Sequence, residues 1–281
     1  MKIVRAIAEM KKLSVGWRHA GMMIAFVPTM GALHEGHLSL VRAAKKSGDK
    51  VVTSIFVNPI QFGPKEDFRR YPRTFQNDAH LLSEEGVDAL FYPRAKEMYP
   101  LGFRTTIRVA GLSDTLCGRF RPGHFEGVAT VVAKLFAIVS PHVAFFGQKD
   151  YQQCKVIEQM TKDLDLGIKI RMMPIVREGD GLAMSSRNRN LSPKQRKLAS
   201  GIFSVLCGIR QEVQRGKRDA HALKSEALRS LKRGGISAID YVEIVDGDTL
   251  QPLKTVRAPA LIAVAVRIGS TRLIDNMVLA R

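Results

Sequence analysis

Cysteine is scarce in this sequence, and its scarcity excludes two classes of protein. Three cysteines occur among 281 residues, far apart and without a Cys-x-x-Cys spacing. An odd number of widely separated cysteines fits neither a disulfide framework nor a zinc knuckle. We therefore expect Cys117, Cys154 and Cys207 to be small, buried hydrophobic side chains.

Long apolar runs are also missing. No stretch approaches the roughly 18 apolar residues of a membrane span. The opening residues Met1-Lys2-Ile3-Val4-Arg5 do not lead into the apolar core of a signal peptide. The sequence therefore predicts a cytoplasmic globular protein with no membrane partner.

Acidic residues are fewer than basic ones. The sequence has 26 Asp and Glu and 44 Lys and Arg, which gives a net charge of +18. Such an excess attracts polyanions. The basic residues are nevertheless scattered singly or in pairs, without the long basic run or aromatic interleaving of a nucleic-acid surface. We expect no nucleic-acid partner, and either steering of an anionic substrate or solubility explains the charge. A basic RNA-binding protein, which would bind with a steep salt dependence, stays as an alternative.

Apolar strand-like runs alternate with helix-like periodicity over the first 173 residues. Expected strands are 22–27, 51–57, 88–92, 143–146 and 168–173, and expected helices are 37–46, 77–85, 128–139 and 151–164. This alternation is typical of an α/β fold in which a parallel sheet has helices on both faces. We predict a Rossmann-like nucleotide-binding domain at residues 1–175.

The pattern changes after Pro174. Two helices are expected at 193–215 and 220–232, and three β-rich runs follow at 241–245, 260–268 and 271–274. Short connections between such runs favour an antiparallel sheet. Residues 176–281 are therefore predicted to form a smaller C-terminal α+β lid domain, with the boundary near 174–177.

Unusual polar residues gather where the expected strands end. In open parallel sheets, ligands bind beyond the carboxyl ends of the strands, where helix N-termini present free N–H groups. Four strand exits carry such residues: Thr29 and His34; Asn58 and Gln61; Gln148, Lys149 and Asp150; and Ser185, Ser186 and Arg187 after a strand expected to end near Val176.

The strongest local pattern is Pro28-Thr29-Met30-Gly31-Ala32-Leu33-His34-Glu35-Gly36-His37. Its glycines permit close backbone approach to a phosphate, and two histidines three residues apart are expected on one helical face. The pattern predicts a phosphate site for a nucleotide. A metal site is less favoured because no third ligand stands at a recognisable spacing.

Six sequence blocks carry a resemblance to a known family. They are the block from Val27 to His37, Phe56-Val57-Asn58-Pro59-Ile60-Gln61-Phe62, Tyr71-Pro72-Arg73-Thr74, Arg121-Pro122-Gly123-His124-Phe125, Phe146-Gly147-Gln148-Lys149-Asp150-Tyr151-Gln152-Gln153, and Asp180-Gly181-Leu182-Ala183-Met184-Ser185-Ser186-Arg187-Asn188. In this order they resemble the pantothenate synthetase family of adenylate-forming nucleotidyltransferases.

The resemblance implies a two-step ligase whose first domain, residues 1–175, binds pantoate as well as the nucleotide. Pantoate and ATP would give pantoyl-adenylate and pyrophosphate, and β-alanine would then displace AMP to give pantothenate. It also implies Mg²⁺ as a cofactor and a homodimer as the assembly.

The resemblance also implies roles for individual residues, and the chemistry of several side chains fits them. The residues that would bind ATP are Pro28, Met30, His34, Gly36, His37, Gly147, Lys149, Asp150, Val176, Met184, Ser185, Ser186 and Arg187, and the catalytic ones among them are His34, His37, Lys149, Ser185, Ser186 and Arg187. Pantoate would be bound by Thr29, Asn58, Gln61 and Gln153. The β-alanine side would contain Arg121 and His124, and Asp78 would serve Mg²⁺, directly or through water. Asn77 precedes Asp78 where an acidic residue is common in the family, so the metal ligands stay open.

A second enzyme class shares the paired histidines. A cytidylyl- or adenylyltransferase would use the same turn to make a nucleotide-diphosphate product. It would have no use for the amides of Asn58, Gln61 and Gln153, and it would not release AMP after addition of an amine. Product analysis separates the two classes.

Overall fold

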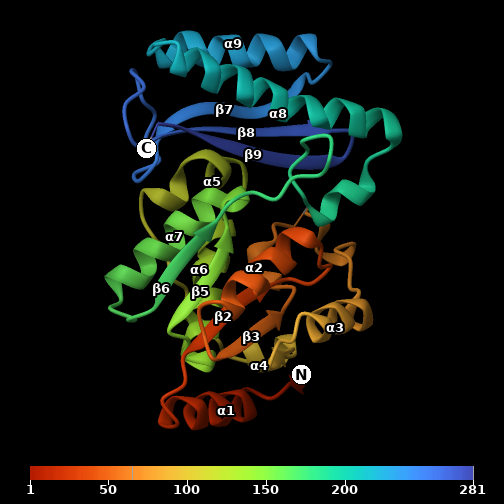
Figure 1. The fold of residues 1–281 in the computed structure, drawn as a ribbon, viewed down its shortest axis with the longest axis vertical. Helices are drawn as coiled ribbons and strands as arrows, with labels where there is room; N and C mark the ends of the chain where they lie inside the picture. The colour runs from red at the N-terminus through yellow and green to blue at the C-terminus, as the bar shows by residue number, and fades with distance from the viewer. Residues whose placement is uncertain (65, 281) are drawn as a thin grey trace. The chain divides into compact units, whose positions relative to one another are not determined.

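The computed structural model describes residues 1–64 and 66–280. Its contacts divide the chain into two compact units (Figure 1). Unit 1 contains Met1–Ser113, Arg121–Gly147 and Gln153–Pro174, and unit 2 contains Asp114–Phe120, Gln148–Gln152 and Ile175–Arg281. Among the described residues, no helix is long and apolar enough to cross a membrane.

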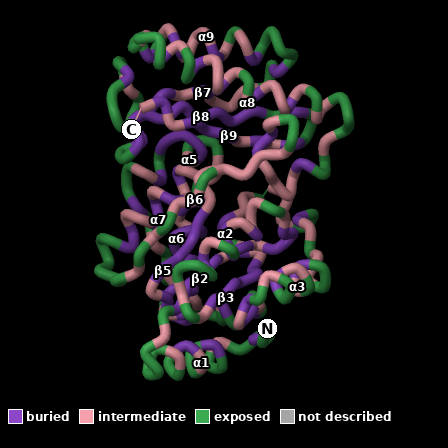
Figure 2. The backbone as a smooth tube through the Cα atoms, in the orientation of Figure 1, coloured by how far each residue is buried: buried purple, intermediate pink, exposed green. Residues whose placement is uncertain are grey.

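Unit 1 is built on a six-stranded sheet in the order β1-β4-β3-β2-β5-β6, with every neighbouring pair parallel. The strands are β1 (Lys2–Val4), β2 (Ile24–Thr29), β3 (Lys50–Ile55), β4 (Ala89–Phe91), β5 (Val143–Gly147) and β6 (Lys169–Met173). The central strands β2 and β3 are buried along almost their whole length (Figure 2). Such burial is expected where both faces of a sheet are covered.

Helices connect these strands: α1 (Ile7–His19), α2 (Glu35–Lys45), α3 (Phe75–Glu84), the short α4 (Ala95–Met98), α6 (His124–Val139) and α7 (Tyr151–Asp163). On one face of the sheet, apolar side chains of α2 and α3 pack in a single cluster with alternate residues of β2, β3 and β5. On the other face, Phe136 of α6 makes edge-on ring contacts with Phe26 and Phe146. The residues of β2 alternate between the two clusters, as strand geometry requires.

Unit 2 contains the antiparallel sheet β7 (Ala238–Asp246), β8 (Ala260–Ile268) and β9 (Thr271–Ala280). One face of this sheet shares a core with α8 (Pro193–Gln214) and α9 (Ala220–Arg233). Two short segments pack on the sheet as well: α5 (Leu116–Phe120) contacts β7, and the 3₁₀ turn η4 (Gln148–Asp150) contacts β9. These contacts explain why both segments group with unit 2.

The predicted Rossmann-like parallel sheet and the C-terminal antiparallel sheet are confirmed. Several elements differ. The helices α1, α4 and α5 and the edge strand β1 were not expected, β7 begins at Ala238, and β9 continues to Ala280. Strand β6 ends at Met173, as the range 168–173 predicted, and does not continue to Val176. Pro174 follows Met173 and has no N–H to donate to the ladder. The predicted single boundary near 174–177 would put residues 114–120 and 148–152 in the first domain. In the structure these two segments belong to unit 2.

Helix α6 approaches the 3₁₀ turn η1 (Pro59–Gln61) closely because a glycine faces that turn. A Cβ at Gly127 would lie 2.5 Å from the Ile60 carbonyl oxygen and 2.6 Å from the Gln61 Cα. Both are backbone atoms, which cannot move aside as a flexible side chain can. Gly127 therefore sets how near Gln61 lies to α6.

We expect Gly127→Ala to lower the free energy of unfolding by about 1–3 kcal/mol through overpacking. The matched control is Gly16→Ala in the exposed interior of α1, where a Cβ would meet nothing within 4 Å. That change should stabilise by roughly 0.5–1 kcal/mol, because alanine is the better helix former. Urea unfolding of both variants measures the difference, and equal effects would contradict the packing argument.

Candidate active site

The chain turns sharply between β2 and α2. Gly31 (φ +81°) and Ala32 (φ +51°) both lie in the left-handed region, which glycine occupies without strain. The Thr29 hydroxyl donates to the Ser54 carbonyl oxygen (2.7 Å) and accepts from the Gly31 N–H (3.1 Å). Thr29 was predicted to bind pantoate, and these contacts show that its hydroxyl also shapes the turn.

Asp78 of α3 holds the same turn from the other side. Its side chain is 1% exposed. One carboxylate oxygen accepts from the Ala32 N–H and the other from the Leu33 N–H, both at 2.9 Å. The Thr74 hydroxyl lies 3.1 Å from both oxygens. Each bond to a charged acceptor is stronger than a neutral one.

Asp78 was expected to serve Mg²⁺ directly or through water, and in this arrangement its carboxylate already has several partners. Its carboxylate is buried and is occupied by backbone N–H groups and a hydroxyl. Within residues 1–64 and 66–280, no group of three or more His, Cys, Asp or Glu side chains could hold a metal ion. Asp78 is therefore an anchor of the β2–α2 turn.

The two histidines of the turn lie side by side. Their ring centres are 4.1 Å apart. His34 is the N-cap of α2 in an extended conformation, and its Nδ1 accepts from the Gly36 N–H at 3.2 Å. The expectation that both residues lie on one helical face is therefore wrong for His34, which precedes the helix, whereas His37 is in its first turn. The two rings are still in contact, because the His34 side chain at the N-cap position folds back over the first turn of α2. A helix N-terminus with two imidazoles beside it suits an anionic group.

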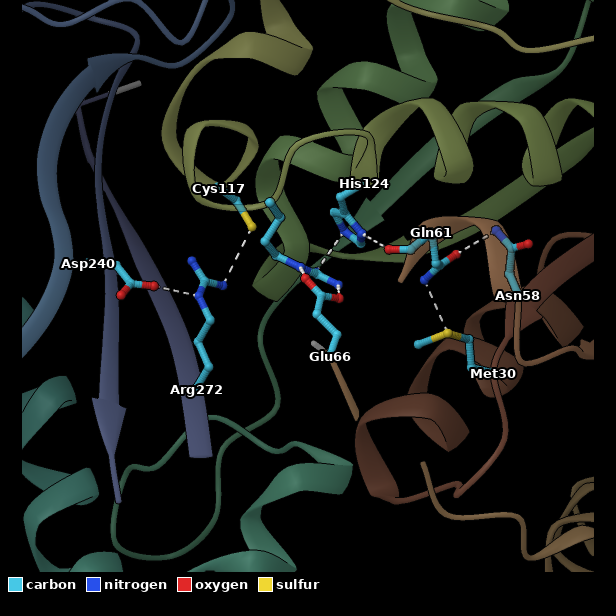
Figure 3. Close-up of polar contacts among 9 residues, drawn as sticks. Met30, Asn58, Gln61, Glu66, Cys117, His124, Asp240 and Arg272 are labelled. Carbon is cyan, nitrogen blue, oxygen red and sulfur yellow. Dashed lines mark hydrogen bonds and ion pairs between the residues drawn. The ribbon is translucent and has the colours of Figure 1, made fainter. Parts of the chain in front are cut away.

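Buried amides form a connected group after β3 (Figure 3). Asn58 is 1% exposed and Gln61 is 7% exposed. The Asn58 Nδ2 donates to the Gln61 Oε1 and to the Gly127 carbonyl oxygen, each at 3.0 Å. The Tyr99 hydroxyl donates to the Asn58 Oδ1 at 2.7 Å. Burial raises the pKa of Tyr99, so its phenol stays neutral and able to donate.

The orientation of the Gln61 amide follows from these bonds. Its oxygen accepts from Asn58, so its nitrogen points the other way and lies 3.2 Å from the Met30 sulfur. An amide nitrogen carries two hydrogens, and a thioether is a weak acceptor. Gln61 therefore keeps donor capacity, and Figure 3 shows its nitrogen directed toward Met30.

Arg121 and His124 support the main chain of Gln61. Arg121 forms a two-bond ion pair with Glu66 (2.8 and 2.6 Å), and its third nitrogen lies 3.0 Å from the His124 Nε2. Burial tends to raise the pKa of Glu66, but the hydrogen bond and charge of Arg121 outweigh it and hold that pKa below its usual range. The His124 Nδ1 lies 2.9 Å from the Gln61 carbonyl oxygen.

These contacts decide the tautomer of His124. Arginine can only donate hydrogen bonds, so the His124 Nε2 must accept. The Nδ1 then carries the proton and donates to the Gln61 carbonyl oxygen. The sequence predicted Arg121 and His124 on the β-alanine side; the structure links both to Gln61, on the predicted pantoate side.

Other predicted site residues of unit 1 are placed by their elements. Pro28 lies near the end of β2, Met30 and Gly36 flank the turn, Gly147 ends β5 and Gln153 is in the first turns of α7. All five are partly exposed. Their positions at the carboxyl ends of strands agree with the expected location of a ligand.

Lys149 and Asp150 lie in η4, within unit 2. Their side chains form an ion pair of 3.8 Å between the Lys149 Nζ and an Asp150 oxygen. The lysine side chain is only 22% exposed. Lys149 therefore has one carboxylate neighbour at a long distance and retains capacity to bind an anion.

Residues 176–188 form a loop closed by its own hydrogen bonds. The Met184 N–H donates to the Val176 carbonyl oxygen at 3.0 Å. Ser185 caps the 3₁₀ turn η5 (Ser186–Asn190), and its hydroxyl accepts from the Arg187 N–H at 3.2 Å. The buried Asn188 donates to the Ala183 carbonyl oxygen at 3.0 Å. Ser185, Ser186 and Arg187 are thus held on one short turn and are partly exposed.

Sequence reasoning missed several residues that hold these groups in place. They are Glu66, Tyr99, Asp275 and Asn276. Tyr99 and Glu66 lie in irregular segments without a periodic pattern. Asp275 and Asn276 interrupt the apolar run 273–280 of β9. Two adjacent polar residues inside such a run could have indicated a buried polar role.

A family model described as pantoate-beta-alanine ligase matches residues 2–278. The chain belongs to this family. It is 52% identical over 279 residues to the pantothenate synthetase of Thermotoga petrophila, covering 99% of this chain and 100% of that one. The pantothenate synthetase structure from Thermus thermophilus covers all of both chains at 44% identity, with a TM-score of 0.93.

A third relative is a pantoate-beta-alanine ligase from Francisella tularensis, whose structure is described as complexed with beta-gamma ATP and beta-alanine. It is 35% identical, with a TM-score of 0.83, and covers 99% of this chain and 98% of that chain. The predicted family and the enzyme class, a carbon–nitrogen ligase of pantoate and β-alanine, are confirmed.

The anchoring role of Asp78 makes a prediction about stability. We expect Asp78→Ala to lower the free energy of unfolding by at least about 3 kcal/mol, because two buried N–H groups lose a charged acceptor. The control is Asp49→Ala, where an exposed carboxylate accepts one N–H, from Met23; it should cost about 1 kcal/mol. Chemical denaturation measures both. Wild-type stability of Asp78→Ala with a changed Mg²⁺ requirement would instead favour a metal role.

Proposed function

We propose that the ligase reaction proceeds through pantoyl-adenylate. The pantoate carboxylate oxygen bonds to the α-phosphorus of ATP, and the bond from that phosphorus to the β-phosphate oxygen breaks, releasing pyrophosphate. The β-alanine amine then attacks the acyl carbon. The bond to AMP breaks, the amine loses a proton, and pantothenate is formed.

The observation that carries this proposal is the buried, uncharged amide group built on Asn58 and Gln61. An attacking carboxylate must be oriented without having its charge neutralised. Gln61 has an N–H directed away from Asn58 and suited to that carboxylate. Asn58 can accept a pantoate hydroxyl on the second lone pair of its Oδ1, and Gln153 supplies a further amide. Preorganised positioning of this kind contributes much of the rate in such reactions.

We propose separate nucleotide roles for the residues of each unit. In unit 1, His34 and His37, at the N-terminus of α2, bind phosphate oxygens, and Pro28, Met30, Gly36 and Gly147 line the nucleotide. In unit 2, Lys149 stabilises the charge that builds on the α-phosphate, and Asp150 binds ribose hydroxyls. Val176, Met184, Ser185, Ser186 and Arg187 supply contacts for the departing pyrophosphate.

Among the described residues, no cluster of three or more His, Cys, Asp or Glu side chains could hold a metal ion, and the Asp78 carboxylate already accepts two N–H groups of the turn. The Mg²⁺ expected with ATP would therefore be held by the nucleotide phosphates and water, which suits an ion that usually keeps several waters. No step is assigned to side-chain metal coordination.

Isotope exchange between pyrophosphate and ATP tests the proposal. The wild-type protein should exchange only when pantoate is present, and should release AMP only when β-alanine is added. Exchange without pantoate, or a nucleotide-diphosphate product, would favour the alternative nucleotidyltransferase class.

We expect Lys149→Ala to slow pantoate-dependent exchange by on the order of 10²–10³, because its ammonium gains interaction as charge builds on the α-phosphate. Pantothenate formation from presynthesised pantoyl-adenylate and β-alanine should stay near the wild-type rate. The control is Lys162→Ala, at the other end of α7. Wild-type exchange in a folded Lys149→Ala protein would remove Lys149 from the mechanism, and equal loss of both half-reactions would give it a general structural role.

We expect Gln61→Ala to raise the pantoate KM in exchange about tenfold, the effect of losing one hydrogen bond of roughly 1.4 kcal/mol to a charged group. The ATP KM should change less than twofold. Gln159→Ala is the control, because that amide bonds to the exposed Asp163 on the outer face of α7. Equal loss of pantoate and ATP binding would place Gln61 elsewhere in the site.

A further inference from the structure

Two adjacent polar residues, Asp275 and Asn276, interrupt the apolar run 273–280 of strand β9. Each is only 4% exposed. Successive side chains of a strand point to opposite faces of its sheet, so the two residues act on different sides. Burial of polar groups is costly unless they are hydrogen-bonded, and both residues are extensively bonded.

Asn276 holds the backbone that carries Lys149. Its Nδ2 donates to the Gln148 carbonyl oxygen at 2.9 Å and to the Lys149 carbonyl oxygen at 3.0 Å. The Gln148 Nε2 donates in return to the Asn276 Oδ1 at 3.3 Å. Both hydrogens of one buried amide are therefore used on two consecutive carbonyl groups, and this fixes the point from which the Lys149 side chain extends.

Asp275 holds the start of the loop that leads to Ser185. Its two oxygens accept from Arg177 at 2.7 and 2.9 Å. Arg177 also donates to the Gly181 carbonyl oxygen at 3.0 Å, and its guanidinium lies 3.9 Å from the centre of the Phe203 ring. The carboxylate thus orients an arginine that closes the loop from 177 to 181.

The two residues are also linked to each other. The Asn276 N–H lies 2.8 Å from the Asp275 Oδ1, one of the two oxygens that accept from Arg177. One dipeptide of β9 therefore anchors two segments that are far apart in sequence, and both segments belong to unit 2.

We propose that Asp275 and Asn276 are positioning residues for adenylate formation. Asn276 sets the position of Lys149, and Asp275 sets the loop that carries Ser185, Ser186 and Arg187. This inference rests on the proposed roles of those residues. Neither Asp275 nor Asn276 needs to touch a substrate, because a displacement of about 1 Å in a group that stabilises the transition state can cost 10²-fold in rate.

Isosteric substitutions test the proposal. Asn276→Asp replaces the donating NH₂ by an oxygen that faces two carbonyl oxygens, and Asp275→Asn removes the charge that faces Arg177. We expect the kcat of pantoate-dependent exchange to fall by about 10-fold to 10²-fold in each variant. The pantoate KM should change less than twofold, and pantothenate formation from presynthesised pantoyl-adenylate and β-alanine should stay near the wild-type rate.

Met277→Ala is the matched control. It lies on the same strand and removes side-chain volume from the core shared with α8 and α9, without a bond to the Lys149 segment. It should destabilise unit 2 and leave the ratio of the two half-reactions unchanged. If Asn276→Asp does not fold, Asn276→Ala, which removes the donors without adding a charge, is measured in its place. A parallel loss of both half-reactions in the folded variants would overturn the proposal, as would exchange at the wild-type rate.

The outcomes separate this inference from the proposed function. Absence of pantoate-dependent exchange in the wild-type protein would defeat the proposed reaction itself. Exchange that is lost in Lys149→Ala and intact in both β9 variants would leave the reaction standing and overturn only the positioning role.

Discussion

The two hydrogen bonds from the Ala32 and Leu33 N–H groups to the buried Asp78 carboxylate determine the shape of the β2–α2 turn. The turn passes through two left-handed residues, and at Ala32 this conformation costs free energy because the residue is not glycine. His34 follows this turn, so the path of the turn sets the position of His34 at the N-cap of α2. The contact between the His34 and His37 rings depends on that position. Asp78, which the sequence suggested as a residue serving Mg²⁺, thus stabilises the β2–α2 turn through its hydrogen bonds.

The same kind of interaction recurs at other loops of the site. Loops expose backbone groups that secondary structure does not satisfy, and buried ones must find partners. His124 satisfies the Gln61 carbonyl oxygen, and Asn276 satisfies those of two consecutive residues in η4. Side chains far away in sequence therefore decide where each loop lies.

The electrostatic character of the amide group follows from its neighbours. Tyr99 stays neutral because burial raises the pKa of its phenol, and His124 is held as a neutral tautomer between Arg121 and the Gln61 carbonyl oxygen. The charge of Arg121 is matched by Glu66. Although the chain carries a net charge of +18, the amides themselves are uncharged. This neutrality is what the proposed nucleophilic carboxylate requires.

The sequence by itself determined most of the strands and helices, the parallel and antiparallel character of the two sheets, and the family. These depend on local periodicity and on short motifs, which survive in a linear pattern. Only the tertiary structure decided what each polar side chain touches: that Asp78 binds a turn, that Thr29 is used within it, that Arg121 and His124 support Gln61, and that Asn276 holds the Lys149 backbone. Packing chooses these hydrogen-bond partners, because burial forces each polar group to pair with whichever group the fold brings within about 3 Å.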